Sequence, residues 1–83
     1  MDIRNFAGFA AAAELMNFTL AAKRLNITQS ALSRQIRALE TYLGVELFEK
    51  AGRNVRLTAG GQALFAKVND VLQADRALRT SAS

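Results

Sequence analysis

No proline occurs in this chain of 83 residues, and only five residues are glycine. Proline ends or kinks a helix because it has no amide hydrogen and its ring collides with the preceding turn. A chain without proline can therefore form helices without interruption, and its many alanine and leucine residues favour helices further. We expect a mostly helical fold whose segments are joined by short turns.

The length and composition fit one small folded domain and exclude several classes of protein. Hydrophobic residues make up 51% of the chain and charged residues 22%, which is typical of a globular protein. Cysteine and histidine are both absent, which excludes disulfides, thiol catalysis and the usual zinc ligands. No apolar run reaches the roughly 18 to 20 residues of a membrane span, and no signal peptide is visible. We expect a cytoplasmic protein that is not an enzyme, needs no cofactor or metal and contacts no membrane.

The positive charge of the chain is concentrated in its middle. Residues 23–56 contain seven basic and three acidic residues, which accounts for the whole formal net charge of +4. A basic region on a small domain favours a polyanionic partner such as nucleic acid, although an ordinary solvated surface can carry the same charge. The place of these residues in the fold decides between the two.

Periodicity and capping residues divide the first half of the chain into three helices. Apolar residues recur at helical spacing over residues 3–16 and predict the first helix. The second is short and begins at a cap formed by Asn17 or Thr19. Thr28 is placed to cap the third helix, which Gly44 ends.

The third predicted helix, from about residue 29 to residue 43, has two chemically different faces. One face is apolar and is expected to be buried; it comprises Leu32, Ile36, Leu39 and Leu43. The other face is polar throughout; it comprises Gln29, Ser30, Ser33, Arg34 and Arg37. The helix is therefore expected to pack on the domain with one side and to offer hydrogen-bonding and basic groups with the other.

The second half of the chain predicts a hairpin and a last helix. Two short extended segments around a turn with Gly52 and Asn54 favour a small β-hairpin. A lone hairpin is barely stable in water, so this one must lean on the helices. Thr58 is placed to cap a helix over residues 59–79, and residues 80–83 are expected to fray.

The last helix has two unusual features. Gly60 and Gly61 weaken its first turn by about 1 kcal/mol each relative to alanine, so we expect close packing or a change of chain direction there. Further along, apolar residues form a seam; it comprises Leu64, Val68, Val71 and Leu78. Such a seam packs either against its own domain or against a second copy of the chain.

Residues 19–36 combine a short helix, a tight turn and a second helix with a polar outer face, which is the pattern of a helix-turn-helix. Small Ala22 suits the crossing of the two helices, and Asn26 tolerates the left-handed conformation of the turn. The first turns of the second helix in this motif meet base edges of DNA. Arginine forks onto guanine, glutamine pairs with adenine and serine accepts either. The base-reading candidates are therefore Gln29, Ser30, Ser33 and Arg34.

Short motifs extend this pattern along nearly the whole chain. They are Asn17-Phe18-Thr19 to Ala22, Ser30 to Ile36, Leu39-Glu40, Leu43-Gly44-Val45, Leu47-Phe48, Gly52-Arg53, Val55, Leu57-Thr58 and Gly61. With them the chain resembles the N-terminal domain of LysR-type transcriptional regulators over residues 3–79. Ser30 stands where many of these proteins have proline, and Gly60 stands where they have alanine.

The resemblance implies a fold class and a division of the chain. Residues 1–58 are expected to form a winged helix-turn-helix, with three helices and the hairpin as its wing. Residues 59–83 are expected to form a linker helix used for dimerisation, with a frayed C-terminus. LysR-type regulators continue into an effector-binding domain that this sequence does not contain, so we expect a fragment of a longer regulator.

The resemblance also implies roles for single residues. Gln29, Ser33 and Arg34 fall on base-reading positions, and Ser30 occupies another with a different side chain. Arg53 matches the wing arginine that reaches the minor groove, where a narrow groove attracts basic side chains. Chemistry and placement add four candidate phosphate contacts; they are Thr28, Arg37, Lys50 and Arg56. The seam of the linker helix is the candidate dimer interface, with packing against its own domain as the alternative.

The predicted function is sequence-specific binding of double-stranded DNA by a homodimer on an inverted-repeat site, with a higher oligomer open to the full-length protein. Two alternatives are the winged domain of molybdate-responsive regulators and a module that only associates with proteins. An association surface should expose aromatic and aliphatic anchors where the third helix is polar and basic. An enzyme is disfavoured because no nucleophile–base pair or glycine-rich phosphate loop is present.

Overall fold

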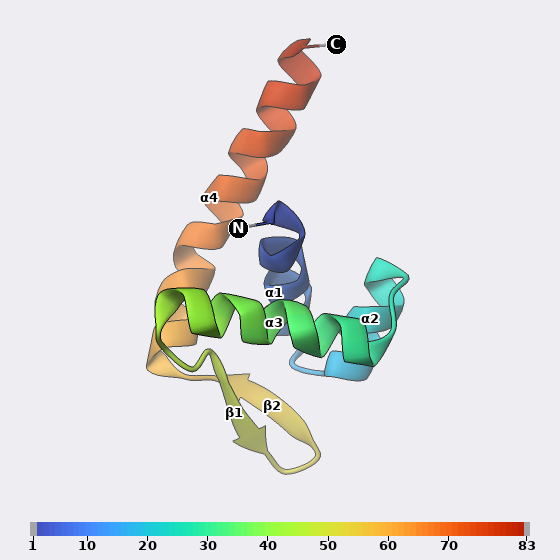
Figure 1. The fold of residues 1–83 in the computed structure, drawn as a ribbon, viewed down its shortest axis with the longest axis vertical. Helices are drawn as coiled ribbons and strands as arrows, with labels where there is room; N and C mark the ends of the chain where they lie inside the picture. The colour runs from blue at the N-terminus through green and yellow to red at the C-terminus, as the bar shows by residue number, and fades with distance from the viewer. Residues whose placement is uncertain (1, 83) are drawn as a thin grey trace.

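The structure, a computed structural model, describes residues 2–82. Its elements are α1 (Ile3–Leu15), α2 (Phe18–Leu25), α3 (Gln29–Leu43), β1 (Phe48–Ala51), β2 (Asn54–Leu57) and α4 (Ala59–Ala82). Figure 1 shows the first three helices packed together, the two-stranded hairpin below α3, and α4 extending away from the domain. The predicted order of three helices, a hairpin and a long helix is confirmed.

α1 is bounded by a capping carboxylate and a left-handed residue. The Asp2 carboxylate caps its start by accepting the Arg4 amide at 2.9 Å. The Arg4 guanidinium also donates to this carboxylate, and that side-chain hydrogen bond lowers the pKa of Asp2. At the other end Met16 has a φ of 53° and stops the helix at Leu15.

α2 and α3 are joined by the tight turn that the sequence predicts. Asn17, rather than Thr19, caps α2, and its side-chain oxygen accepts a backbone amide of the first turn at 3.0 Å. Asn26 has a φ of 57° and ends α2 in the left-handed conformation. The Thr28 hydroxyl caps α3 by accepting the Ala31 amide at 3.0 Å.

α3 buries only part of its predicted apolar face. Leu32, Ile36 and Leu39 are buried, but Leu43 is 40% exposed, so its predicted burial is wrong. Leu43 is the last residue of the helix, and Gly44 turns the chain away directly after it with a left-handed φ of 72°. This end of the helix therefore stays open to solvent.

The core consists of two clusters of buried side chains. One involves α1, α3, α4 and the chain around the hairpin; it comprises Phe9, Ala10, Ala13, Leu39, Leu47, Leu57 and Val68. The other lies between the first three helices; it comprises Ala11, Ala12, Ala21, Ala22, Leu32 and Ile36. Phe48 packs against both clusters, with its ring centroid 5.5 Å from that of Phe9 and 5.2 Å from that of Phe18. The first residue of the hairpin is thereby anchored on the helices.

The start of α4 is held by Thr58 and by close packing at one glycine. The Thr58 hydroxyl accepts the Gly61 amide at 3.0 Å and donates to the Glu46 carbonyl at 2.6 Å, so the predicted cap is confirmed. A Cβ added at Gly61 would overlap the Leu47 carbonyl oxygen, whereas one added at Gly60 would meet its nearest atoms at 3.4 Å. The expected close packing exists at Gly61 and not at Gly60.

α4 is longer than predicted. It is helical up to Ala82, whereas the sequence predicts a helix only to residue 79, and Ser83 lies outside the described residues. An ion pair between Arg79 and Asp75, one helical turn apart, supports its last turns at a distance of 3.0 Å. In the part of the chain that the structure describes, no helix is both long and apolar enough to cross a membrane.

Candidate nucleic-acid interface

The polar face of α3 lies on the surface of a helix whose other side is fixed in the core. Ser33 is half-buried, and the other four residues of the face are exposed; they are Gln29, Ser30, Arg34 and Arg37. Leu32 and Leu39 are fully buried on the opposite side of the helix. The predicted base-reading residues thus share one face of one well-packed helix.

Thr28, a predicted phosphate contact, is already used as the cap of α3. Its hydroxyl oxygen accepts the Ala31 amide at 3.0 Å. A hydroxyl group also has one hydrogen to donate, so the cap leaves Thr28 able to bind an anion. The helix N-terminus favours an anion there, because its backbone amides carry partial positive charge.

A side chain from the start of α2 contacts the first residue of α3. The Thr19 hydroxyl donates to the side-chain oxygen of Gln29, with 3.1 Å between Oγ1 and Oε1. The two residues lie ten positions apart on different helices, so no helical periodicity pairs them. Sequence reasoning missed this contact.

The wing is an antiparallel hairpin with Arg53 at its tip. β1 and β2 pair in register up to Ala51 opposite Asn54. Gly52 and Arg53 form the two-residue turn, in which Gly52 has a left-handed φ of 64°. Arg53 is exposed at this turn, where the sequence predicts it.

The wing is tied to the helix-turn-helix by an amide pair. Asn17 Nδ2 donates to Asn54 Oδ1 at 3.1 Å, directly beside Arg53 in the chain. The side-chain oxygen of Asn17 is the cap of α2. The side-chain amide of Asn17 therefore hydrogen-bonds both to the backbone at the start of α2 and to Asn54 of the wing. Sequence reasoning assigned Asn17 only the capping role.

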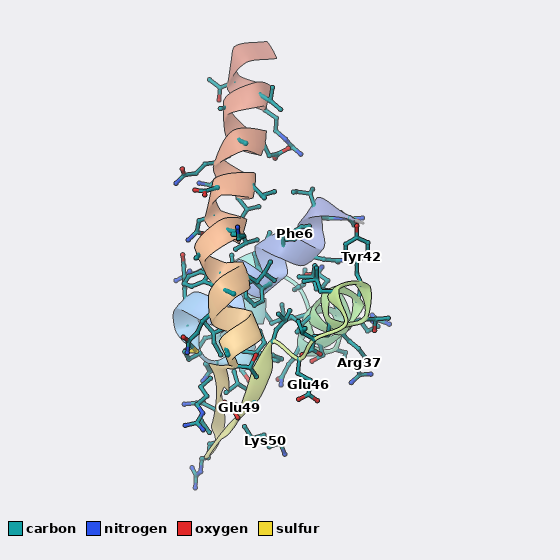
Figure 2. The ribbon with its side chains drawn as sticks, turned by 90° about the vertical axis from the view of Figure 1, so that its left-hand side faces the viewer. Phe6, Arg37, Tyr42, Glu46, Glu49 and Lys50 are labelled. Carbon is teal, nitrogen blue, oxygen red and sulfur yellow. The ribbon has the colours of Figure 1, made fainter. Side chains whose placement is uncertain are left out.

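Arg37 of α3 and Lys50 of the wing line one groove. The groove has a volume of about 210 Å³, and Ser33 and Glu49 line it as well. In Figure 2 the side chains of Arg37 and Lys50 project to the same side of the molecule, with Glu46 on that side too. Two of the predicted phosphate contacts thus lie at one groove between α3 and the wing.

Salt bridges separate the basic residues into two groups. Arg56 pairs with Glu49 across the hairpin at 3.2 Å, so its charge, unlike that of Arg37 and Lys50, is already balanced. Arg24 likewise pairs with Glu14 at 2.6 Å. The residues that form no salt bridge with any part of the chain between residues 2 and 82 include Arg34, Arg37, Lys50 and Arg53. Unbalanced positive charge therefore lies along α3 and the wing.

α4 buries one side against its own domain and leaves another side open. Val68 is fully buried in the same cluster as Phe9, so its predicted place in a dimer interface is wrong. Leu64 is half-buried against that cluster, while Val71 is 43% and Leu78 71% exposed. A helix nearly repeats every seven residues, so Leu64, Val71 and Leu78 share a stripe along α4, and Val68 lies beside it, facing the core. These three residues are called the α4 stripe below.

The surface made by α3 and the wing offers hydrogen-bonding groups and positive charge. Among residues 2–82, no three histidine, cysteine or acidic side chains gather as a metal site requires. A helix-turn-helix with an exposed polar second helix, followed by a basic hairpin, is a winged helix-turn-helix. The fold and this surface define a domain of that class.

The family follows from a match along most of the chain. Residues 3–62 match the profile of the family described as "Bacterial regulatory helix-turn-helix protein, lysR family". The chain belongs to this family and carries the helix-turn-helix domain of a LysR-type transcriptional regulator. The resemblance drawn from the sequence is confirmed.

Named relatives are bacterial regulators of greater length. The "HTH-type transcriptional regulator IlvR" of Caulobacter vibrioides is 49% identical over 82 residues, which is 99% of this chain. The "SDS degradation transcriptional activation protein" of a Pseudomonas species is 43% identical over 82 residues, again 99% of this chain. The chain spans 28% and 27% of the lengths of these two proteins.

Solved structures with the same fold include two DNA complexes. The crystal structure of the CbnR_DBD–DNA complex has a TM-score of 0.89 and 40% identity, and the match covers 99% of this chain and 95% of that one. The BenM_DBD/catB site 1 DNA complex has a TM-score of 0.92 and 34% identity, with 99% and 92% covered. The winged architecture predicted from the sequence is therefore the architecture of known LysR-type domains.

Proposed function

We propose that this chain binds a specific sequence of double-stranded DNA as a homodimer on an inverted-repeat site, in the cytoplasm of a bacterium. α3 enters the major groove, and the wing contacts the neighbouring minor groove. One observation carries the proposal: positive charge without salt-bridge partners in the described chain follows α3 and the wing. The residues concerned are Arg34, Arg37, Lys50 and Arg53.

The side chains of this surface have two kinds of role. Those on the first turns of α3 read base edges; they are Gln29, Ser30, Ser33 and Arg34. Thr28, Arg37 and Lys50 contact phosphates, which positions the protein on the duplex without reading its sequence. Arg56 contributes less, because Glu49 already balances its charge at 3.2 Å.

The comparisons support DNA as the partner. The CbnR and BenM domains were solved with DNA, and each match covers 99% of this chain. The family match over residues 3–62 includes α1 through β2, and so the whole surface described above.

The contact between two copies is assigned to α4. Its C-terminal half extends beyond the domain in Figure 1 and carries the exposed Val71 and Leu78. The α4 stripe is symmetric about Val71, so two antiparallel copies bring Leu64 of one beside Leu78 of the other. One recognition helix reads only a few base pairs. A two-fold symmetric dimer reads two such half-sites, which together form an inverted repeat. In this proposal residues 1–58 bind DNA and residues 59–83 join the copies.

The proposal is tested by selecting bound sequences from random duplex DNA and then measuring Arg34→Ala on the selected site. If Arg34 forks onto guanine, the variant should lose about 1 to 3 kcal/mol of binding free energy on that site, and far less on random DNA. A competition assay with both duplexes measures the difference.

The matched control for this experiment is Arg76→Ala. Arg76 is exposed on α4, beside α1 and α2, and its removal deletes the same charge away from the proposed DNA surface. The control should lower affinity slightly and equally on both duplexes. Equal losses for Arg34→Ala would make Arg34 a phosphate contact, and a selection without a repeated motif would contradict dimeric, sequence-specific binding.

The wing gives a second expected result, which concerns the sequence beside the half-site. Arg53→Ala should weaken binding most where the flanking DNA is rich in A·T pairs, because a narrow minor groove attracts arginine by its negative potential. Affinities for duplexes with A·T or G·C flanks measure the effect. Lys50→Ala, on the same hairpin, is the control and should weaken both equally. If Arg53→Ala loses the same affinity on both kinds of duplex, the wing makes only a general electrostatic contact with DNA.

A further inference from the structure

The exposed face of α3 continues beyond the residues assigned to base reading. Thr41 lies on the same stripe of the helix as Ser30, Arg34 and Arg37, because these residues follow one another at steps of four, three and four. All four are exposed. At the rise of an α-helix, Thr41 lies about 16 Å along the axis from Ser30. The surface offered by α3 is therefore about three helical turns long.

Tyr42 follows Thr41 at one edge of this surface. It is 67% exposed, and its hydroxyl has no hydrogen-bond partner among residues 2–82. In Figure 2 its side chain projects from the edge of α3 opposite the wing, whereas Arg37 and Lys50 lie toward the wing and line one groove with it. The two edges of α3 thus carry different side chains, and the edge with Tyr42 has no role in the surface described so far.

A second groove joins Tyr42 to the base-reading part of α3. It has a volume of about 530 Å³ and is lined by Arg34, Arg37, Ala38, Thr41 and Tyr42, none of which is acidic. Neither arginine forms a salt bridge with any residue between 2 and 82. The groove therefore carries unbalanced positive charge and is continuous with the proposed DNA surface through Arg34.

The dimensions of a helix and of DNA indicate what this edge of α3 meets. An α-helix with its side chains is about 10 to 12 Å across, and the major groove is about 12 Å wide. A helix that lies in the groove fills it, so each of its edges faces one of the two phosphate backbones. Arg37 and Lys50 serve the backbone on the side of the wing. Tyr42 faces the other backbone, and a tyrosine hydroxyl is one of the groups that donate to phosphate oxygens.

We propose that the Tyr42 hydroxyl donates a hydrogen bond to a DNA phosphate on the wall of the major groove opposite the wing. The inference rests on the proposed function, with α3 in the major groove. It gives α3 a contact to each backbone, one charged and one neutral. Phosphate oxygens carry no sequence information, so Tyr42 contributes to the position of α3 and to affinity, and not to base preference.

The experiment removes the hydroxyl alone, with Tyr42→Phe, and neutralises the phosphates of the selected duplex one at a time as methylphosphonates. Affinities of the wild-type chain and of the variant are measured on the intact duplex, on random DNA and on each modified duplex. Thermal unfolding checks that the change at this exposed residue leaves the fold intact. Thr80→Val is the control, because it removes an exposed hydroxyl from α4, away from α3.

Tyr42→Phe should weaken binding about two- to ten-fold per half-site, the range of one hydrogen bond, and equally on the selected and the random duplex. Its salt slope should equal that of the wild-type chain, since no charge is removed. At one phosphate of each half-site, the methylphosphonate should weaken the wild-type chain more than Tyr42→Phe by that same factor. This coupling to a single phosphate is what a purely structural role of Tyr42 would not produce. Thr80→Val should leave every affinity unchanged.

Three results would overturn the inference, and each has its own meaning. An unchanged affinity of Tyr42→Phe would show that the hydroxyl makes no contact with DNA. A loss that depends on the base pair would make Tyr42 a base-reading residue. A loss that is coupled to no phosphate would place the contact of Tyr42 on protein, between bound copies of the chain. In each case the wild-type chain still selects a sequence, whereas failure of the proposed function itself appears as wild-type binding without any sequence preference.

Discussion

Val68→Lys should unfold the domain at temperatures where the wild-type chain is folded. Val68 is fully buried between α4 and the core, so a lysine there is either charged without a partner or forced to be neutral. We expect a loss of about 3 to 5 kcal/mol, against a total stability of about 4 to 12 kcal/mol for a domain of this length. Circular dichroism during heating should show a fall in Tm of about 12 °C or more.

The matched control places the same charge on the α4 stripe. The double variant Val71→Lys and Leu78→Lys changes two exposed residues, so it should stay folded, and sedimentation should show a monomer. If a bound dimer neutralises about six to ten phosphates, its affinity falls about 10³- to 10⁵-fold between about 50 and 200 mM salt. The monomeric variant should show about half that salt slope.

These two variants test separately the side of α4 that packs on the core and the side that is exposed. A dimer that persists with lysine at both exposed positions would move the interface away from the α4 stripe. A folded, stable Val68→Lys domain would contradict the packing of α4 against the core.

Gly61→Ala should destabilise the domain although alanine is the better helix former. Its methyl group would overlap the Leu47 carbonyl oxygen and press on the Leu57 side chain. A backbone carbonyl cannot rotate aside, so α4 or the chain entering β1 must shift. We expect a net loss of about 2 kcal/mol or more in the free energy of unfolding, measured by denaturant titration.

The neighbouring glycine is the control and should respond with the opposite sign. A Cβ at Gly60 meets its nearest atoms, the Glu46 carbonyl and Val45, at 3.4 Å, which is ordinary contact. Gly60→Ala should therefore stabilise the helix by about 0.5 to 1 kcal/mol. Equal gains at both positions would show that the start of α4 does not need the close approach at Gly61.

The helices and the hairpin can be predicted from the sequence because their signals are local. Asn26 ends α2 by adopting the left-handed conformation. The hydroxyl groups of Thr28 and Thr58 cap the starts of α3 and α4. The turn at Gly52 depends only on the residues around it. Nothing beyond a few neighbouring positions is needed to place these boundaries.

The orientation of α4 depends on packing that the sequence pattern does not contain. Leu64, Val68 and Val71 are all apolar and lie within one broad side of the helix. Which of them is covered depends on how α4 crosses α1, and that crossing buries Val68 and leaves Val71 exposed. The predicted burial of Leu43 is wrong for a related reason. Helical periodicity places Leu43 on the apolar face of α3, but it does not show that the core ends before this last residue of the helix.

The candidate site likewise has some features that the sequence predicts and others that depend on the folded structure. Helical periodicity is enough to place Gln29, Ser33 and Arg34 on one face of α3. The salt bridge between Arg56 and Glu49 depends on the register of the hairpin, which pairs these residues directly. Contacts such as those of Thr19 and Asn17 depend on how separate elements meet in space, and no spacing along the chain reveals them.

The attachment of the wing bears on the thermodynamics and geometry of DNA recognition. Phe48 packs on both core clusters and Asn17 binds Asn54, so the hairpin and α3 keep one separation before DNA arrives. The conformational entropy of arranging the two contacts is then lost when the chain folds rather than when it binds. Because α3 and the wing are held at one separation, their two contacts fit only DNA sites that lie at one distance and one helical phase along the duplex. A DNA segment with suitable bases at the wrong phase would be rejected by geometry, without any hydrogen bond that discriminates against it.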